Sequence, residues 1–358
     1  MLKKKMKAAV FYGARNIKIE MVQIPKPGPN DVLMKVKACG ICGSDLHSYK
    51  LGLFIEPGQI MGHEYVGEIV EVGSEVKDVK IGERVTGQGT KPCRVCYWCK
   101  RQEYGYCPDV FHTLVGYGRP GAFAEYVLLK DAVINQTIFK IPDTIDDETG
   151  ATAEPFSVGV SAIRSTGIKH GDKVVVLGAG LIGNGCMQAA KAVGAQVLVT
   201  DISQQRLELA HKLGADDVFN VGTGNPVEWV KDKFGAGPYH FHEGENAGGM
   251  ADVVIDAAGV PSTPQQAIDM VKSGGTICIV ASAEEPAPID TLSINLKGIR
   301  WVPGLGGEGG IGSAIPYLAD GRMRSKELIT HRFPLEEIEE AFETQLRPGD
   351  SMKVMITF

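Results

Sequence analysis

The chain has 358 residues, of which 44% are hydrophobic and 22% are charged, and its formal net charge is −6. This length exceeds what one ordinary hydrophobic core serves, so two domains are expected. A negative charge without a basic stripe argues against a nucleic-acid or anionic-membrane partner. The segment MLKKKMKAAVFYG has no apolar run long enough for a signal peptide, and no stretch has the length of a membrane span. The expected location is therefore the cytoplasm, where thiols stay reduced.

Residues 1–156 show the pattern of a mostly-β domain. Short β-type runs such as KAAVFYG, DVLMKVKACG and EYVGEIVEVG are separated by Gly and Pro at strand-like intervals, and helical periodicity is weak. Metal-capable Cys, His and Glu residues occur in three segments of this region, CGICGSDLH (39–47), GHEYVGEIV (62–70) and AEPFSVG (153–159). The region is therefore expected to carry a site as well as a β-structure.

A lobe within this domain, residues 91–107, holds four of the eight cysteines of the chain. Their spacing, C-x2-C-x2-C-x7-C, matches a closed tetrahedral zinc site. Because such a site leaves no position for a substrate, we interpret this zinc as structural. The alternative is an exposed loop of unpaired thiols, which a cytosolic protein rarely tolerates. The four cysteines are Cys93, Cys96, Cys99 and Cys107.

From residue 173 to about residue 282, predicted strands and helices alternate. KVVVLG (173–178) is an apolar run that fits a buried parallel strand, and a helix and the strand QVLVTD follow it. The next helix begins after Ser203 as its N-cap and ends at Gly214. This alternation predicts a doubly wound parallel sheet, and hence an α/β Rossmann domain over residues 157–300. Residues 301–358 end in the strand-like SMKVMITF and are expected to return to the first domain.

The turn VVVLGAGLIGNG places G-x-G-x-x-G between the buried strand and the following helix. Gly178 permits the tight turn, Gly180 lets the backbone approach a pyrophosphate, and Gly183 lets helix and strand pack closely. The free N–H groups at the start of the helix, around Leu181 and Ile182, would then face the phosphates. The turn therefore predicts dinucleotide binding.

Asp201 stands at the end of the next predicted strand, where a carboxylate accepts hydrogen bonds from a ribose 2′-hydroxyl and repels a 2′-phosphate. This favours NAD over NADP. Arg206 argues in the opposite direction, for NADP, because a guanidinium there can bind a 2′-phosphate; it can also simply stack on adenine. We predict NAD as the cofactor from the acidic residue.

Four linked motifs resemble a zinc-dependent branch of the medium-chain dehydrogenase/reductase superfamily, that of the sorbitol, 2,3-butanediol and threonine dehydrogenases. They are the C-G-I-C-G-S-D-x-H stretch, the G-H-E stretch, the four-cysteine lobe and the Rossmann turn, in this order. The resemblance covers essentially the whole chain and implies a GroES-like catalytic domain joined to a Rossmann domain. It also implies two zinc ions per chain, one catalytic and one structural, and a homo-oligomer, either dimer or tetramer.

Carried over residue by residue, the resemblance assigns Cys42, His63 and Glu154 to the catalytic zinc, with Glu64 as an alternate ligand. One thiolate, one imidazole and one carboxylate balance Zn²⁺ and leave a fourth position open for water or an alcohol oxygen. Glu154 binds directly or through water, and Glu64 has the alternative of pairing with a nearby basic residue. Asp45 matches a carboxylate that orients His63 through its other ring nitrogen.

Ser44 and His47 resemble the family's proton relay, in which the serine takes the proton of the alcohol and the histidine releases it to solvent. The implied activity is reversible oxidation of a secondary alcohol, a polyol or vicinal diol, to the ketone. Glu154-Pro-Phe-Ser resembles the polyol and butanediol branch. Where polyol enzymes carry an Arg-Tyr pair after Lys-Gly, this chain has Lys297-Gly298-Ile299-Arg300-Trp301, which leaves the substrate open.

Two other functions stay open. Within the class, the alternative is L-threonine 3-dehydrogenase activity on an amino alcohol. From another class, it is a catalytically silent, zinc-stabilised binding protein of the same fold, because fold alone does not determine function. The segment GPYHFHEGENAGG (237–249) is predicted to be a solvated loop or hairpin, and the glycine-rich GLGGEGG (304–310) removes side chains that would shape a pocket.

Overall fold

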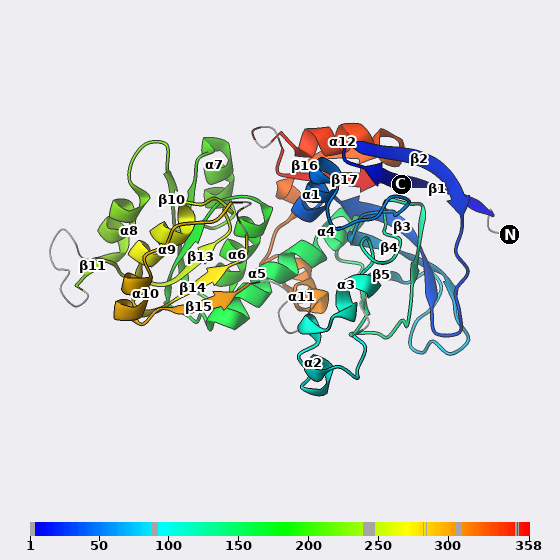
Figure 1. Ribbon diagram of the computed structural model, residues 1–358, viewed down its shortest axis with the longest axis horizontal. Helices are drawn as coiled ribbons and strands as arrows, with labels where there is room; N and C mark the ends of the chain where they lie inside the picture. Colours follow the sequence, from blue (N-terminus) through cyan, green and yellow to red (C-terminus); the bar gives the residue numbers. More distant parts are fainter. Residues whose placement is uncertain are drawn as a thin grey trace. The chain divides into compact units, whose positions relative to one another are not determined.

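The computed structural model describes residues 4–87, 92–238, 248–281, 283, 285–304, 310–347, 349 and 351–358. The chain divides into two units, drawn in Figure 1. Unit 1 comprises Met1–Glu154, Ile311–Ala319 and Ser325–Phe358, and unit 2 comprises Pro155–Gly310 and Asp320–Arg324. The chain thus leaves unit 1 after Glu154 and returns to it at Ile311.

Unit 1 is built mainly from β-strands. An antiparallel pair joins β1 (Lys5–Gly13) to β2 (Asn16–Gln23). A larger sheet has the order β16-β17-β3-β4-β5-β7, and β6 also pairs with β3. Its strands are β3 (Val32–Gly40), β4 (Glu64–Val72), β5 (Arg84–Gly87), β6 (Tyr126–Leu129), β7 (Ile138–Lys140), β16 (Ile329–Pro334) and β17 (Lys353–Thr357).

The centre of this sheet positions the predicted site. The last strand, β17, pairs antiparallel with β3, which ends just before Cys42, and β3 pairs with β4, which begins at Glu64. Figure 1 shows these three strands side by side. Large side chains such as Tyr65 and Phe123 are fully buried in the core beneath them. Burial of this apolar surface is what holds the three segments together.

Short helices connect the strands of unit 1. Among them, α12 packs against β17. The α-helices are α1 (Gly43–Leu51), α2 (Tyr97–Lys100), α3 (Asp109–Thr113), α4 (Asp147–Ala151), α11 (Ile315–Ala319) and α12 (Ile338–Gln345). The 3₁₀ turns are η1 (Tyr104–Tyr106), η3 (Ile311–Ser313), η4 (Lys326–Leu328) and η5 (Leu335–Glu337).

The main sheet of unit 2 has six parallel strands in the order β10-β9-β8-β13-β14-β15. In chain order this is 3-2-1-4-5-6, so the predicted doubly wound parallel sheet is confirmed. The strands are β8 (Lys173–Leu177), β9 (Gln196–Asp201), β10 (Asp217–Asn220), β13 (Ala251–Asp256), β14 (Val271–Ile279) and β15 (Arg300–Pro303). The helices are α5 (Ala153–Thr166), α6 (Leu181–Ala192), α7 (Gln204–Lys212), α8 (Pro226–Phe234), α9 (Thr263–Met270) and α10 (Thr291–Lys297).

Two segments of unit 2 that the sequence singled out lie partly outside the described residues. Strands β11 (Ala236–Gly237) and β12 (Gly248–Gly249) pair antiparallel and so join the two ends of segment 237–249. The residues between them, 239–247, lie outside the described part, as do residues 305–309 of the glycine-rich stretch. The histidine and glutamate residues of the first of these undescribed stretches are His240, His242, Glu243 and Glu245. In the described part of the chain, no helix is both long and apolar enough to cross a membrane.

Candidate active site and metal centres

The start of helix α1 carries Cys42, Ser44, Asp45 and His47. Cys42 is the N-cap residue, and its backbone N–H donates to Asp45 Oδ2 at 3.0 Å. This local bond explains why the short sequence folds into a helix at this point, because it satisfies a donor that the first turn leaves free. Ser44 and His47 are three residues apart, so they lie on one side of the helix, and both are half-buried.

His63 lies immediately before β4 and is only 5% exposed. Its Nδ1 atom is 3.5 Å from Oδ1 of the fully buried Asp45, and neither atom has a hydrogen-bond partner within the described residues. Burial opposes the charged imidazole, but Asp45 and Cys42 together raise the pKa of His63 well above its ordinary value. The arrangement turns Nδ1 toward Asp45 and leaves Nε2 for another ligand, as the predicted role of Asp45 requires.

Cys42, His63 and Glu64 form a compact group in which the candidate ligand atoms all lie within 4.8 Å of one another. A thiolate, an imidazole and a carboxylate suit Zn²⁺, so these donors fit the metal that the sequence predicts. Glu154, half-buried at the start of α5, does not belong to this group among the described residues. Its role as a zinc ligand stays a prediction.

Glu64 also makes the ion pair that the sequence left open as its alternative. Its Oε2 atom is 2.5 Å from Nζ of the buried Lys353 on β17, and the same ammonium donates to the carbonyl of Ile41 at 2.7 Å. Burial opposes this charge, but Glu64 raises the pKa of Lys353 above its ordinary value. A Cβ atom at Gly40 would lie 2.2 Å from Glu64 Oε2, so the glycine makes room for the carboxylate.

The four cysteines of the lobe form a second compact group, again with ligand atoms within 4.8 Å of one another. The N–H groups of Cys93 and Cys96 donate to the sulfur atoms of Cys107 and Cys93, each at 3.3 Å. Backbone N–H groups lower the pKa of Cys93 to about 7, whereas burial raises that of Cys99 to about 12. Four sulfur donors at this spacing fit the closed zinc site that the sequence predicts.

The glycine turn between β8 and α6 has the geometry of a phosphate-binding turn. Gly178 has φ +94°, and a Cβ atom at Gly183 would lie 1.9 Å from the carbonyl oxygen of Gly178. A Cβ atom at Gly180, in contrast, would meet no described atom within 4 Å, so the space above it is open. Asp201 ends β9, and its carboxylate accepts N–H bonds from Ala179 at 2.7 Å and from Ser203 at 2.8 Å.

Comparisons with known proteins agree with this geometry. Residues 28–143 match the alcohol dehydrogenase GroES-like domain, and residues 182–316 match the zinc-binding dehydrogenase family. Sorbitol dehydrogenase of Bacillus subtilis is 35% identical over 98% of this chain and 97% of its own length. Two solved structures are similar over 99% of this chain. The structure of 2R,3R-butanediol dehydrogenase from Bacillus subtilis has a TM-score of 0.86 and 30% sequence identity, with 99% of that chain covered. The structure of a zinc-binding dehydrogenase from Sinorhizobium meliloti bound to NADP has a TM-score of 0.88 and 32% sequence identity, with 100% of that chain covered.

The chain belongs to the zinc-dependent medium-chain dehydrogenases. The GroES-like and Rossmann-type domains predicted from the sequence are thereby confirmed, and the chain is an enzyme that uses zinc and a nicotinamide dinucleotide. All eight cysteines of this dehydrogenase lie in the described part of the chain and are free thiols.

Two tyrosines of the dehydrogenase lie beside the candidate site and were not found from the sequence. The ring of Tyr117 is 5.2 Å from that of His63, measured between centroids, at an interplanar angle of 43°. Burial raises the pKa of Tyr117 to about 12, and the nearby imidazole of His63 acts in the opposite direction. Tyr65 is fully buried, and its hydroxyl has no hydrogen-bond partner within the described residues. Neither tyrosine belongs to a spacing pattern, so no local signal could have revealed them.

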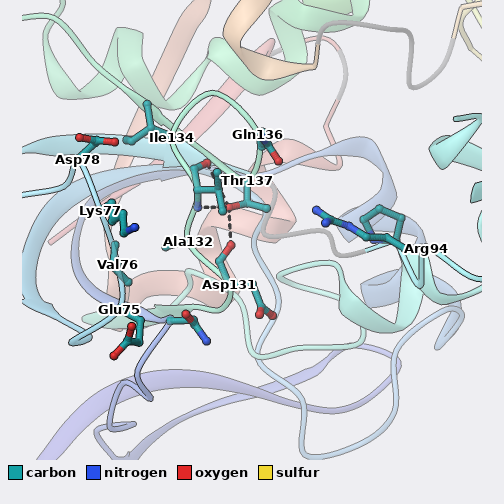
Figure 2. Close-up of a pocket in the computed structure, with 13 residues that line it drawn as sticks. Glu75, Val76, Lys77, Asp78, Arg94, Asp131, Ala132, Ile134, Gln136 and Thr137 are labelled. Atoms are coloured by element: carbon teal, nitrogen blue, oxygen red, sulfur yellow. Dashed lines mark hydrogen bonds between the residues drawn. The ribbon is translucent and has the colours of Figure 1, made fainter.

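Figure 2 shows a surface pocket of unit 1 with a volume of about 610 Å³. Its wall includes Glu75, Lys77 and Asp131, and Thr137 donates from Oγ1 to the carbonyl of Asp131 at 2.9 Å. None of the ligands in the Cys42 group lines it. The donor chemistry of the dehydrogenase, and not this hollow, therefore identifies the candidate active site.

Proposed function

We propose that this dehydrogenase oxidises a secondary alcohol of a polyol or vicinal diol to the ketone, with NAD as the hydride acceptor. The observation that carries the proposal is the compact group of Cys42, His63 and Glu64 in a dehydrogenase of this family. The sorbitol and butanediol dehydrogenases among its relatives support the substrate class.

The balanced reaction converts the alcohol and NAD⁺ into the ketone, NADH and one proton. Cys42, His63 and a carboxylate would hold the zinc ion, which would supply a Lewis acid that lowers the pKa of an alcohol toward neutrality. Asp45 keeps the imidazole of His63 in one orientation through Nδ1. Ser44 accepts the proton of the alcohol, and His47 passes it on to solvent.

The choice of NAD rests on Asp201. Its carboxylate lies at the end of β9 and is held by the N–H groups of Ala179 and Ser203, so it is fixed beside the glycine turn. A fixed negative charge there repels a 2′-phosphate and retains lone pairs for ribose hydroxyls. Arg206 is the residue through which a preference for NADP would act instead.

We also propose that the enzyme works in the cytoplasm as a dimer or tetramer of identical chains. Its free thiols require a reducing compartment if both zinc sites are to be loaded. Neither nucleic acid nor membrane is a partner in this proposal, since the chain carries a net charge of −6.

The test is a panel of alcohols assayed for NADH formation, combined with metal analysis of the purified protein. Sugar alcohols, vicinal diols, simple secondary alcohols and L-threonine are compared at equal concentration. Turnover of diols or sugar alcohols with two zinc ions per chain is the expected result. Preferential oxidation of threonine to aminoacetone would replace the proposal with the amino-alcohol alternative. A fully zinc-loaded protein without any turnover would favour the catalytically silent binding protein.

A further inference from the structure

Helix α6 carries a buried asparagine that the cofactor site described above does not use. Asn184 directly follows Gly183, the last glycine of the turn, and is only 1% exposed. Asparagine is a poor helix former, and a buried polar side chain opposes folding unless it is hydrogen-bonded. Two unfavourable effects therefore meet at this position, and the contacts of the side chain show what offsets them.

The side-chain amide of Asn184 donates to two carbonyl groups of the glycine turn. Its Nδ2 atom lies 2.8 Å from the carbonyl oxygen of Ala179 and 3.1 Å from that of Gly180. Its Oδ1 atom is buried and has no hydrogen-bond partner in the described part of the chain. Because carbonyl oxygens only accept, the NH₂ half of the amide must face them. The two donors, and not the oxygen, are what this side chain contributes to the turn.

These two carbonyl groups belong to the peptide units that carry the candidate phosphate-binding N–H groups. The carbonyl of Ala179 shares a planar peptide with the N–H of Gly180, and the carbonyl of Gly180 shares one with the N–H of Leu181. Gly180 is the N-cap residue of α6, so both N–H groups lie at the helix start, where anions bind. Holding each carbonyl therefore fixes the direction of the N–H on the other side of the same peptide.

The earlier peptides of the turn are held by the neighbouring strand β9. The N–H of Gly178 donates to the carbonyl of Thr200 at 2.7 Å, and the N–H of Ala179 donates to Oδ2 of Asp201, also at 2.7 Å. The two peptides that follow are the ones that Asn184 holds. Its side chain thus completes the support of the turn.

We propose that Asn184 is a positioning residue that orients the N–H groups of Gly180 and Leu181 toward the pyrophosphate of the dinucleotide. Hydrogen bonds in series polarise one another, so the bonds to the two carbonyls also make these N–H groups stronger donors. Their alignment matters because hydrogen bonds to a charged group are the strong ones. The inference depends on the dinucleotide that this family uses, and not on which alcohol is oxidised.

Asn184→Leu tests the proposal, because it keeps the branched shape of the side chain and removes both donors. The measurement is the dissociation constant of adenosine divided by that of ADP, each from isothermal titration calorimetry. ADP adds only the two phosphates to adenosine, so this ratio isolates the contribution of the turn. We expect the ratio to fall about 10- to 100-fold, the range for loss of one hydrogen bond to a charged group, while the affinity for adenosine stays near wild type. Asn184→Ala, which removes the donors without adding volume, should give the same fall.

Gln188→Leu is the matched control. Gln188 lies one turn further along α6, is equally buried, and exchanges two hydrogen bonds with the backbone of Arg324 instead of the turn. This variant also loses a buried amide, yet it should leave the ratio unchanged.

An unchanged ratio in both Asn184 variants, or an equal fall in Gln188→Leu, would overturn the proposal. So would a wild-type protein that binds ADP no more tightly than adenosine, because the turn then contributes nothing to pyrophosphate binding. A protein that shows the expected ratios but oxidises no alcohol overturns only the proposed function.

Discussion

Two buried carboxylates, Asp45 and Glu64, have different roles because Asp45 faces a histidine and Glu64 faces a lysine. Asp45 faces the Nδ1 atom of His63 and accepts the N–H of Cys42, so its charge is used to orient a candidate ligand. Glu64 faces the ammonium of Lys353, which neutralises it inside the protein. A charge at this depth is tolerated only when it is paired, and zinc or lysine can each provide that pairing.

Lys353→Met tests this competition between lysine and metal. The variant leaves Glu64 buried without its partner, so we expect the zinc-free protein to lose about 3–5 kcal/mol of stability. Zinc should recover much of this loss, because the released carboxylate becomes a metal ligand. Denaturant unfolding with and without zinc measures both effects.

The control for that experiment removes both charges. The double variant Glu64→Gln, Lys353→Met should be more stable without zinc than Lys353→Met alone. If all variants unfold at the same denaturant concentration, the ion pair does not contribute as described.

Asp201→Ala tests the choice of cofactor. The variant loses the carboxylate that excludes a 2′-phosphate, so the ratio of kcat/KM for NAD over that for NADP should fall about 10- to 100-fold. Glu208→Ala, an exposed acidic residue on α7, is the control and should leave the ratio unchanged. An unaltered ratio in Asp201→Ala would remove this residue from the cofactor site.

At the scale of elements, the short cysteine lobe depends on its own metal donors more than on a hydrophobic core. In its described residues, 92–107, the cysteine lobe has only the four-residue helix α2 and the turn η1, and it carries exposed aromatic side chains such as Tyr97 and Tyr106. So small a segment buries too little apolar surface to fold stably by itself. We therefore expect zinc bound by its four thiols to stabilise the fold of the lobe.

Cys107→Ser should therefore remove the structural zinc and lower the melting temperature of the dehydrogenase. Metal analysis should find one zinc ion per chain in place of two, because the Cys42 group does not share ligands with the lobe. Cys39→Ser, at a buried cysteine outside both groups, is the control for loss of a thiol. Retention of both zinc ions in Cys107→Ser would contradict the assignment.

At the scale of the whole molecule, each unit has one buried lysine among its described residues, and the pKa values of the two are shifted in opposite directions although burial acts in the same direction on both. Lys353 in unit 1 faces a carboxylate, and its pKa is raised. Lys297 in unit 2 donates to the carbonyl of Ile268 at 2.5 Å, and burial lowers its pKa to about 8. A neutral acceptor compensates desolvation of a charge less well than an ionic one does.

The contribution of Lys297 to the stability of the dehydrogenase should consequently rise with pH through one window. The folded-state pKa of Lys297 is about 8 and the ordinary value is 10.5, so the unfolded chain binds more protons between these values. Excess protons on the unfolded chain mean that the free energy of unfolding increases with pH there. Subtracting the pH profile of Lys297→Met from that of the wild type isolates this contribution. Parallel profiles between pH 8 and 10.5 would show that Lys297 does not titrate as stated.

Several features were predictable because their signals are local. The spacing of Cys93 to Cys107 fits a closed metal site, and the glycines from Gly178 to Gly183 fit one turn, so a few residues of backbone geometry suffice. The alternation of strands and helices likewise predicted the parallel sheet. One boundary has no local signal, however: α9 ends at Met270 and β14 begins directly at Val271. Pairing of Val271 with Ala251 across the sheet outweighs local helix preference there.

The amino-acid sequence by itself indicated the family and predicted both sets of metal donors and the dinucleotide turn, because each motif depends on residues that are close along the chain. Only the tertiary structure decided that Lys353 pairs with Glu64, 289 residues away, and that the ring of Tyr117 packs against that of His63. It also places Glu64, and not Glu154, in the compact group with Cys42 and His63 among the described residues, while the zinc-ligand role of either carboxylate stays a prediction. These contacts arise when β17 pairs with β3 and the Tyr117 turn packs on the His63 segment, and no spacing in the sequence encodes such distant pairings.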